Sequence, residues 1–354
     1  KGHKHRVARV IMGFVKGFQL AEISQLTQSI SKPMGVLWLF ATILFLFSFF
    51  LFLFKKEWWF FLVIGAVIIS QILIIIYWKE AKFATVANII ILIPAIIGLA
   101  TYNFENTYKK EVSNSISITN FTEDIITQKD IDSLPPIIRK YLNYVGILGK
   151  PKVHNVKIIF VGVMRDREKD WFSFTSEQYN FFDSPTRLFF MKAKVKGLPT
   201  NGYHAYKKEA ATMLIKVLSL FTVVDIKEET MYLTETVTFF NDLCLFAPSC
   251  LIDKRIKWEA IDDVSIKATF TNNETSITAI LYFNKKGQLV NFISNDRYSV
   301  SEMKTFSFST PVKNYENSNG YNLPTYGEAI WHYPDGEFVY GKFNLKRIEY
   351  NVFK

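Results

Sequence analysis

The sequence predicts a membrane anchor of three spanning α-helices followed by a mainly antiparallel β domain, half-barrel-like and extracytoplasmic, with one or two internal helices. Two observations predict this fold class. Three long uncharged apolar runs lie within residues 33–104, and from residue 153 onward apolar and polar residues alternate with the period of a strand. The composition agrees, because 49% of the 354 residues are hydrophobic and 33 are Phe, which is too apolar for a disordered chain.

The net charge of +10 raises the question of a nucleic-acid partner. Most of the basic excess lies in residues 1–102, beside the apolar runs, and not on one folded face as in a duplex-binding domain. Phospholipid headgroups are the anions expected there. The predicted partners are therefore membrane lipids and no nucleic acid.

The apolar runs span residues 33–54, 58–78 and 83–104, and each is long enough to cross a bilayer. The separators between them are short, so we expect tight turns and antiparallel neighbours. Gln71 and Asn88 are polar residues inside the runs, for which interhelical amide hydrogen bonds are expected and a transport role is the alternative.

Basic residues near the membrane predict the orientation of the anchor. Residues 1–33 and the turn at 79–82 carry eight Lys and Arg on one side, against four from the turn at 55–57 and the early downstream segment. The amino end is therefore predicted inside and residues 105–354 outside. The localisation that follows is the bacterial cytoplasmic (inner) membrane, with several passes.

Four regions are expected along the chain. Residues 1–33 are a basic amphipathic segment whose apolar stripe is typical of a helix in the membrane interface. Residues 34–104 are the transmembrane region. Residues 105–150 are a polar tether and a short amphipathic helix ended by Gly146, and residues 151–354 are the β domain. The stripe consists of Val7, Val10, Ile11, Phe14, Val15 and Phe18.

Within the β domain, turn signals at residues 272–274, 284–287, 319–320 and 335–336 predict hairpins of a meander of roughly nine to eleven strands. Helices are expected around residues 210–221 and over residues 234–246, the second stopped by Pro248. A curved sheet wrapped around these helices is the arrangement expected to hide the apolar face.

Several motifs resemble an uncharacterised bacterial family over about residues 130–354. They are ETVTFFND at 235–242, WEAIDD at 258–263, ILYFNKKGQL at 280–289, GYNLPT at 320–325 and PDG at 334–336. The membrane part, with GFVK at 13–16 and ISKPMG at 30–35, resembles versions from Bacteroidetes-type bacteria. In those versions we expect a further apolar stretch where this chain has residues 1–9.

That family resembles, more distantly, the lipoprotein-carrier (LolA/LppX-like) half-barrels, which hold acyl chains in a curved sheet. The resemblance implies a membrane-anchored binding module for a lipid, acyl chain or lipoprotein, and leaves open a partner in a membrane complex. An apolar groove is expected from alternate strand residues and the covering helix, with core packing as the alternative for each. The groove candidates are Phe160, Phe172, Phe174, Phe240, Leu243, Phe270, Leu281 and Phe283.

Enzyme signatures are absent from the sequence: it has no Gly-x-Ser-x-Gly, no His-Glu-x-x-His and no phosphate-binding glycine loop. No catalytic residue, cofactor or metal site is predicted. A hydrolase with an unrecognised His or carboxylate site and a structural or assembly subunit remain as alternative functions. Cys244 and Cys250 are expected to be free thiols, with a disulfide as the alternative outside the cytoplasm.

Overall fold

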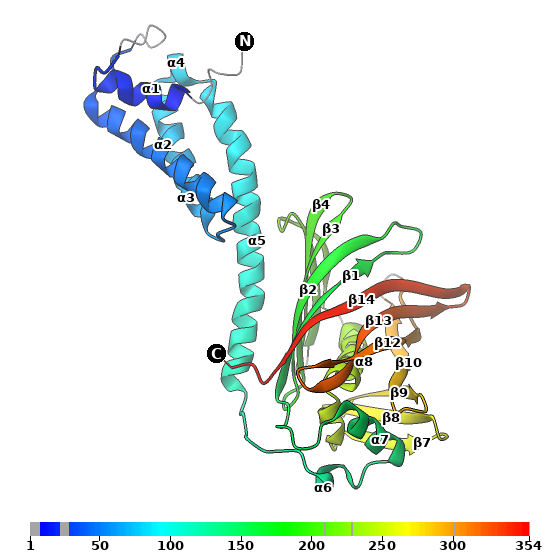
Figure 1. Ribbon diagram of the computed structural model, residues 1–354. Helices are drawn as coiled ribbons and strands as arrows, with labels where there is room; N and C mark the ends of the chain where they lie inside the picture. The colour runs from blue at the N-terminus through cyan, green and yellow to red at the C-terminus, as the bar shows by residue number, and fades with distance from the viewer. Residues whose placement is uncertain (1–7, 22–27, 209, 228, 300–301, 354) are drawn as a thin grey trace. The chain divides into compact units, whose positions relative to one another are not determined.

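The computed structural model describes residues 8–21, 28–208, 210–227, 229–299 and 302–353 (Figure 1). The chain divides into two compact units, Lys1–Phe104 and Glu105–Lys354. The second unit is a curled antiparallel β half-barrel with helices.

The first unit is helical. Its elements are α1 (Ala8–Gly17), α2 (Lys32–Leu53), α3 (Trp59–Ile76), α4 (Trp78–Ala81) and the first part of α5 (Ala84–Ile118). Among the described residues, α2, α3 and α5 are long and apolar enough to cross a membrane, as expected from the three apolar runs. The separator at residues 79–82 is largely helical (α4) instead of a simple turn.

Amide hydrogen bonds link α3 to α5 as predicted. Asn88 Nδ2 donates to Gln71 Oε1 at 3.0 Å, and Ser70 Oγ donates to Asn88 Oδ1 at 3.2 Å. Gln71 Nε2 donates in turn to Thr85 Oγ1 at 3.1 Å. Each amide thus finds partners between helices, which suits a polar group in an apolar surrounding.

Helix α1 packs against α2 through glycines. A Cβ at Gly13 would lie 2.5 Å from the Trp38 ring, and one at Gly17 would lie 3.1 Å from the Gly35 Cα. The spacing of Gly13 and Gly17 is the small-xxx-small pattern that lets helix backbones approach. Of the predicted interfacial stripe, Val7 lies outside the described residues.

The polar residues 107–118 are helical, where we expected an irregular tether, because α5 continues to Ile118. This last part of α5 belongs to the second unit and packs on its sheet through Tyr108, which is buried and stacks on Phe190 at 5.4 Å. After it come α6 (Gln128–Ile131) and α7 (Pro136–Val145). Gly146 ends α7 with a φ of 81°, as expected, and Pro135 is the N-cap of this helix.

Fourteen strands form one sheet in the order β6-β5-β4-β3-β2-β1-β14-β13-β11-β10-β9-β8-β7, with β12 paired to β13. The pairing of β1 with β14, the first and last strands, joins the two halves of the sheet. The first half comprises β1 (Asn155–Met164), β2 (Phe172–Phe181), β3 (Thr186–Val195), β4 (Leu198–Lys207), β5 (Ala210–Val217) and β6 (Phe221–Ile226). The second comprises β7 (Ile256–Ala260), β8 (Ser265–Asn272), β9 (Thr275–Phe283), β10 (Leu289–Ser299), β11 (Lys304–Ser309), β12 (Val312–Ser318), β13 (Tyr321–Tyr333) and β14 (Gly336–Tyr350).

The prediction of a helix around residues 210–221 is wrong, because this segment forms most of the β5–β6 hairpin. It pairs along its length with β4, and Leu218 and Ser219 adopt positive φ in the turn. The periodicity of a short apolar run does not distinguish a helix from a strand. Here the segment forms a strand because it pairs with the edge of β4. This hairpin raises the number of strands above the nine to eleven expected.

Helix α8 (Glu229–Phe246) occupies the concave side of the sheet and is followed by the short helix η1 (Pro248–Ile252) (Figure 1). It touches β4 and β5 of one half and β9, β10 and β13 of the other. The predicted helix over residues 234–246 is therefore confirmed and begins earlier. Its burial by both halves makes it the centre of the main hydrophobic core.

Candidate functional site

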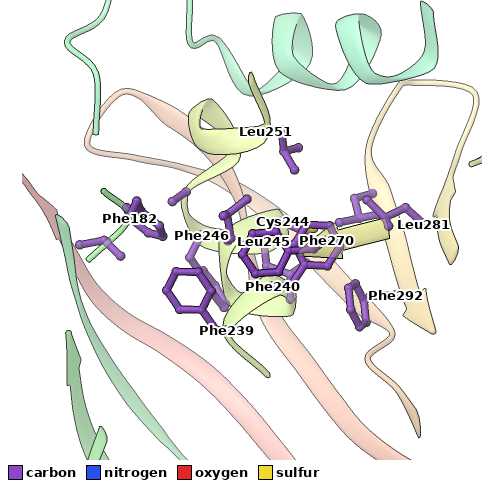
Figure 2. Packing of buried hydrophobic residues seen from close by; sticks show 14 of the residues in the cluster. Phe182, Phe239, Phe240, Cys244, Leu245, Phe246, Leu251, Phe270, Leu281 and Phe292 are labelled. Carbon is purple, nitrogen blue, oxygen red and sulfur yellow. The ribbon is translucent and has the colours of Figure 1, made fainter. Parts of the chain in front are cut away.

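Most of the predicted groove residues lie in a filled core. Figure 2 shows Phe240 beside Phe270, with Phe292 next to them. The Phe240 and Phe270 rings are parallel within 5° at 5.1 Å, and Phe240 meets Phe292 edge-on at 5.9 Å. The structure places five of the eight candidates in this core on the β8–β10 side of α8, fully or almost fully buried: Phe240, Leu243, Phe270, Leu281 and Phe283.

The other three candidates belong to the first half of the sheet. Phe160 and Phe174 are also buried members of the main hydrophobic cluster, and Phe160 in addition lines a cavity between α8 and the sheet. Phe174 lines an open groove on the sheet. Phe172 is half-buried and lines neither of these two pockets.

The cavity lies against the face of α8 opposite the Phe240 core. It has a volume of about 140 Å³ and is partly open. On α8 it is lined by Glu235, Thr238, Asp242 and Leu245, whose spacing places them on one face of the helix. The apolar wall comes from strands and the end of α8, and includes Phe160, Met164, Phe189, Phe246, Phe308, Val312, Phe343 and Leu345.

Arg187 of β3 is the centre of a buried polar network on one side of the cavity. Its Nε donates to Asp242 Oδ2 at 2.8 Å, and its Nη1 donates to Glu235 Oε2 at 3.0 Å. Its Nη2 donates to Gln178 Oε1 at 3.2 Å. Gln178 and Asn180 of β2 also donate to Asp242 Oδ2, at 2.7 and 3.2 Å. The network ties two strands to α8 and satisfies a guanidinium that burial would otherwise penalise.

The charges in the network hold Glu235 ionised. Burial alone would raise the pKa of this carboxyl, but the positive charge of Arg187, with smaller contributions from His204 and Arg297, lowers the pKa to about 2. His204 Nδ1 lies 4.0 Å from Glu235 Oε1. Burial would lower the pKa of Arg187, yet the charges of Asp242 and Glu235 raise it above its ordinary value. Glu235 and Arg187 therefore remain a charged pair across the physiological range.

Among the described residues, two buried side-chain polar atoms of the cavity lining have no hydrogen-bond partner. They are Arg297 Nε and Asn241 Oδ1, both buried. The guanidinium of Arg297 lies over the Phe308 ring at 3.8 Å and near Trp331 at 5.2 Å. The Asn241 amide donates to Thr310 Oγ1 at 2.7 Å, so only its oxygen is unpaired. An unpaired buried polar atom at a cavity wall is available to a water or a ligand.

The histidines considered from the sequence bind separate partners. His154 Nδ1 lies 2.8 Å from Asp183 Oδ2, and His332 Nε2 lies 2.8 Å from Ser309 Oγ. His204 is the one that lines the cavity. Within the described part of the chain, no group of three or more His, Cys, Asp or Glu is placed to hold a metal ion. Cys244 and Cys250 are both free thiols in the structure.

Sequence reasoning missed the charged network, although two signals pointed to it. Glu235 and Asp242 are seven residues apart within the helix predicted over residues 234–246, so they share a face. Arg187 precedes the apolar run of β3, where a charge needs a buried partner. Both acidic residues lie in the ETVTFFND motif that carries the family resemblance.

A model described as "Family of unknown function (DUF6544)" matches residues 124–343. The chain belongs to this family. The DUF6544 segment contains every cavity residue named above except Leu345, and it begins after the three apolar helices.

Comparison with solved structures finds a LolA superfamily protein from Nitrosomonas europaea that is similar to this DUF6544 chain. The TM-score is 0.36 at 11% sequence identity, and the match covers 62% of this chain and 93% of that protein. The LolA half-barrels are also the proteins to which a distant resemblance was expected. No curated protein matches the sequence.

Proposed function

We propose that this DUF6544 protein is a membrane-anchored binding module that holds an acyl chain, from a lipid or a lipoprotein, between α8 and the concave face of its sheet. The observation that carries the proposal is the partly open cavity, which joins an apolar wall to a few converging polar groups. This combination is typical of small-molecule sites. A core that served packing alone would bury those polar groups without leaving space beside them.

The size of the cavity indicates how much of a ligand it takes. At about 140 Å³ it is comparable to a cavity of roughly 150 Å³ that binds benzene, so it holds one end of an amphiphile. A larger open groove of about 680 Å³, lined by Phe174, Lys192 and Lys342, shares Tyr326 with the cavity. The groove side chains Val161 and Val163 alternate with Phe160 and Met164 along β1 and so lie on the other face of the sheet, and the remainder of the ligand would leave through the open side of the cavity.

The anchor supports the same proposal. Three apolar helices precede the family segment, and the surplus of Lys and Arg on one side favours an internal amino end. We place the protein in the bacterial inner membrane with the β domain outside the cytoplasm. A binding module held there would take its acyl ligand from the membrane lipids or from a lipoprotein.

A structural or assembly subunit of a membrane complex is the second candidate. The observation that favours it is the close packing of Phe240, Phe270 and Phe292, which leaves the β8–β10 side of α8 filled by its own side chains. In that case the cavity would be a packing defect that stays empty of lipid.

Mass spectrometry of the acyl lipids extracted from the purified full-length protein distinguishes the binding module from the structural subunit. The test variant is Thr238→Phe, because Thr238 lies on α8 at the cavity wall and a phenyl ring there fills the space. Thr230→Phe is the matched control, with the same substitution on the same helix at a half-exposed position outside the cavity lining.

We expect the unmodified protein and Thr230→Phe to carry the same acyl lipid, and Thr238→Phe to lose it while retaining its melting temperature within a few degrees. The control also corrects for lipids that adhere to the apolar helices, since these are unchanged in all three proteins. Equal lipid content in the three proteins would reject the binding proposal in favour of the structural one.

A further inference from the structure

Arg297 differs from the other arginine of the cavity because it forms no ion pair within the described residues. Arg187 is neutralised by two carboxylates, Asp242 and Glu235. In the part of the chain that the structure describes, no carboxylate lies within ion-pair distance of Arg297, and its Nε is buried without a hydrogen-bond acceptor. A guanidinium in this state at a cavity wall is expected to bind an anionic oxygen.

A β-bulge turns Arg297 toward the cavity. The register of β10 against β11 shifts between Ser294 and Arg297, so two residues oppose one. Asp296, next to Arg297, points to the neighbouring strand, where its Oδ2 accepts from the Thr278 N–H at 2.6 Å. Bulges that re-aim a side chain are common beside binding sites.

Aromatic rings fix the guanidinium in this position. It lies 3.8 Å from the Phe308 ring centroid and within 5.8 Å of the Tyr340 centroid. Stacking on rings holds the plane of an arginine while leaving its edge free to donate hydrogen bonds. The side chain is thereby preorganised for a ligand without an ion pair to break.

The carboxylates of the cavity form their hydrogen bonds with other donors, although the charge of Arg297 contributes to the lowered pKa of Glu235. Asp242 and Glu235 accept hydrogen bonds from Arg187. Glu328 accepts from the Tyr326 hydroxyl at 2.5 Å. Each negative charge of the lining thus has a protein donor, whereas Arg297 keeps an unsatisfied one.

We infer that the amphiphile bound in the cavity carries an anionic head group, a carboxylate or a phosphate, and that Arg297 binds it. This inference rests on the proposed function, because it names the chemical class of the ligand in the same cavity. A neutral alcohol of equal chain length would lose the charge-assisted hydrogen bonds and bind more weakly.

The test is isothermal titration calorimetry at neutral pH on the full-length protein, held in a non-ionic amphipol so that no free alkyl detergent competes. Three probes share one chain length: octanoate, octyl phosphate and octanol. We expect at least one of the two anions to bind about tenfold more tightly than octanol, since a hydrogen bond to a charged group contributes about that factor. The stronger of the two anions identifies the source as a free fatty acid or a phosphate-bearing lipid.

The variant Arg297→Met keeps the length of the side chain and removes its charge. It is expected to abolish the preference for the anion and to leave octanol binding within about twofold, whereas Arg347→Met should change neither. Arg347 is the control because it is an exposed arginine of β14 with its own partner, Glu349. Arg297→Gln serves as a second variant if the first fails to fold.

The outcomes separate this inference from the proposed function. Binding of all three probes with equal affinity, or an anion preference that survives in Arg297→Met and Arg297→Gln, would overturn the role of Arg297 and leave the binding module intact. Absence of binding for every probe would reject the proposed function and this inference with it.

Discussion

At the residue scale, α8 carries two faces with different chemistry. Phe240 faces the aromatic core, and Glu235 and Asp242 face the cavity and its charged network. Substitutions on the two faces should therefore have different consequences. A substitution on the face with Phe240 should change the packing of the core. A substitution on the face with Glu235 and Asp242 should change the charges of the buried network.

Phe240→Ala removes a ring that is completely buried and contacts Phe270 and Phe292. The expected loss in the free energy of unfolding is about 3 to 5 kcal/mol, because a cavity remains after the ring is gone. Phe172→Ala, at a half-buried strand position, should cost about 1 kcal/mol. Urea unfolding of the full-length protein in non-ionic detergent measures both, and equal losses would show that Phe240 is not a packing centre.

The pKa of Glu235 predicts how its contribution to stability depends on pH. The pKa is about 2 in the folded protein against 4.5 for an ordinary glutamate, so the folded state favours the ionised form. The stabilisation is then complete above about pH 4.5 and is lost as the pH falls toward 2.

Glu235→Gln should accordingly lower the free energy of unfolding most at neutral pH, and the difference from the unmodified protein should shrink as the pH falls below 4.5. Glu259→Gln is the control, since Glu259 is exposed and pairs only with Lys267 at the surface. A pH-independent difference between the Glu235 variant and the unmodified protein would contradict the charged state of the network.

At the scale of elements, turn and cap residues in the sequence predicted where helices end and where hairpins turn. Gly146 ends α7, and the hairpin turns at residues 319–320 and 335–336 lie between strands as expected. Tertiary pairing determined the rest. Residues 210–217 form a strand because β4 offers an open edge, and residues 107–118 remain helical because Tyr108 packs on Phe190.

The contact of α1 with α2 is a further element that the residue pattern alone did not predict. Gly13→Val would drive a branched side chain into the Trp38 ring, which a Cβ already meets at 2.5 Å. We expect faster amide hydrogen exchange in α1, measured by mass spectrometry in detergent. Gly65→Val is the control, because nothing lies within 4 Å of a Cβ at Gly65; unchanged exchange in α1 would argue against this packing.

At the scale of the whole molecule, the sequence predicted the type of architecture better than the site. Alternation and turn residues predict strands and hairpins, but they do not state which side of α8 is filled. From the sequence, Phe270 and Phe283 are compatible with a groove wall and with core packing, and in the structure they lie in the core. Arg187 and Arg297 both line the cavity although they are far apart in sequence, because the curved sheet brings their strands to the same cavity.

The orientation of the anchor is a prediction for the whole chain. With more Lys and Arg flanking the amino-terminal side, residues beyond about 105 should be outside the cytoplasm. Protease added to intact spheroplasts is expected to digest this part of the chain, with a cytoplasmic protein as the control for intact membranes. Protection of residues 105–354 until the membrane is opened would reverse the assigned orientation.

The central claim is that an acyl ligand occupies the cavity between α8 and the sheet, and photolabelling tests it most directly. A fatty acid with a diazirine close to its carboxylate is added to the full-length protein, the sample is irradiated, and the modified peptides are mapped by mass spectrometry. The account predicts adducts on peptides that contain Leu245 of α8 or Phe308 of β11, which line the cavity, and their loss in Thr238→Phe. Adducts confined to α2, α3 and the apolar part of α5, with none in the β domain, would contradict it.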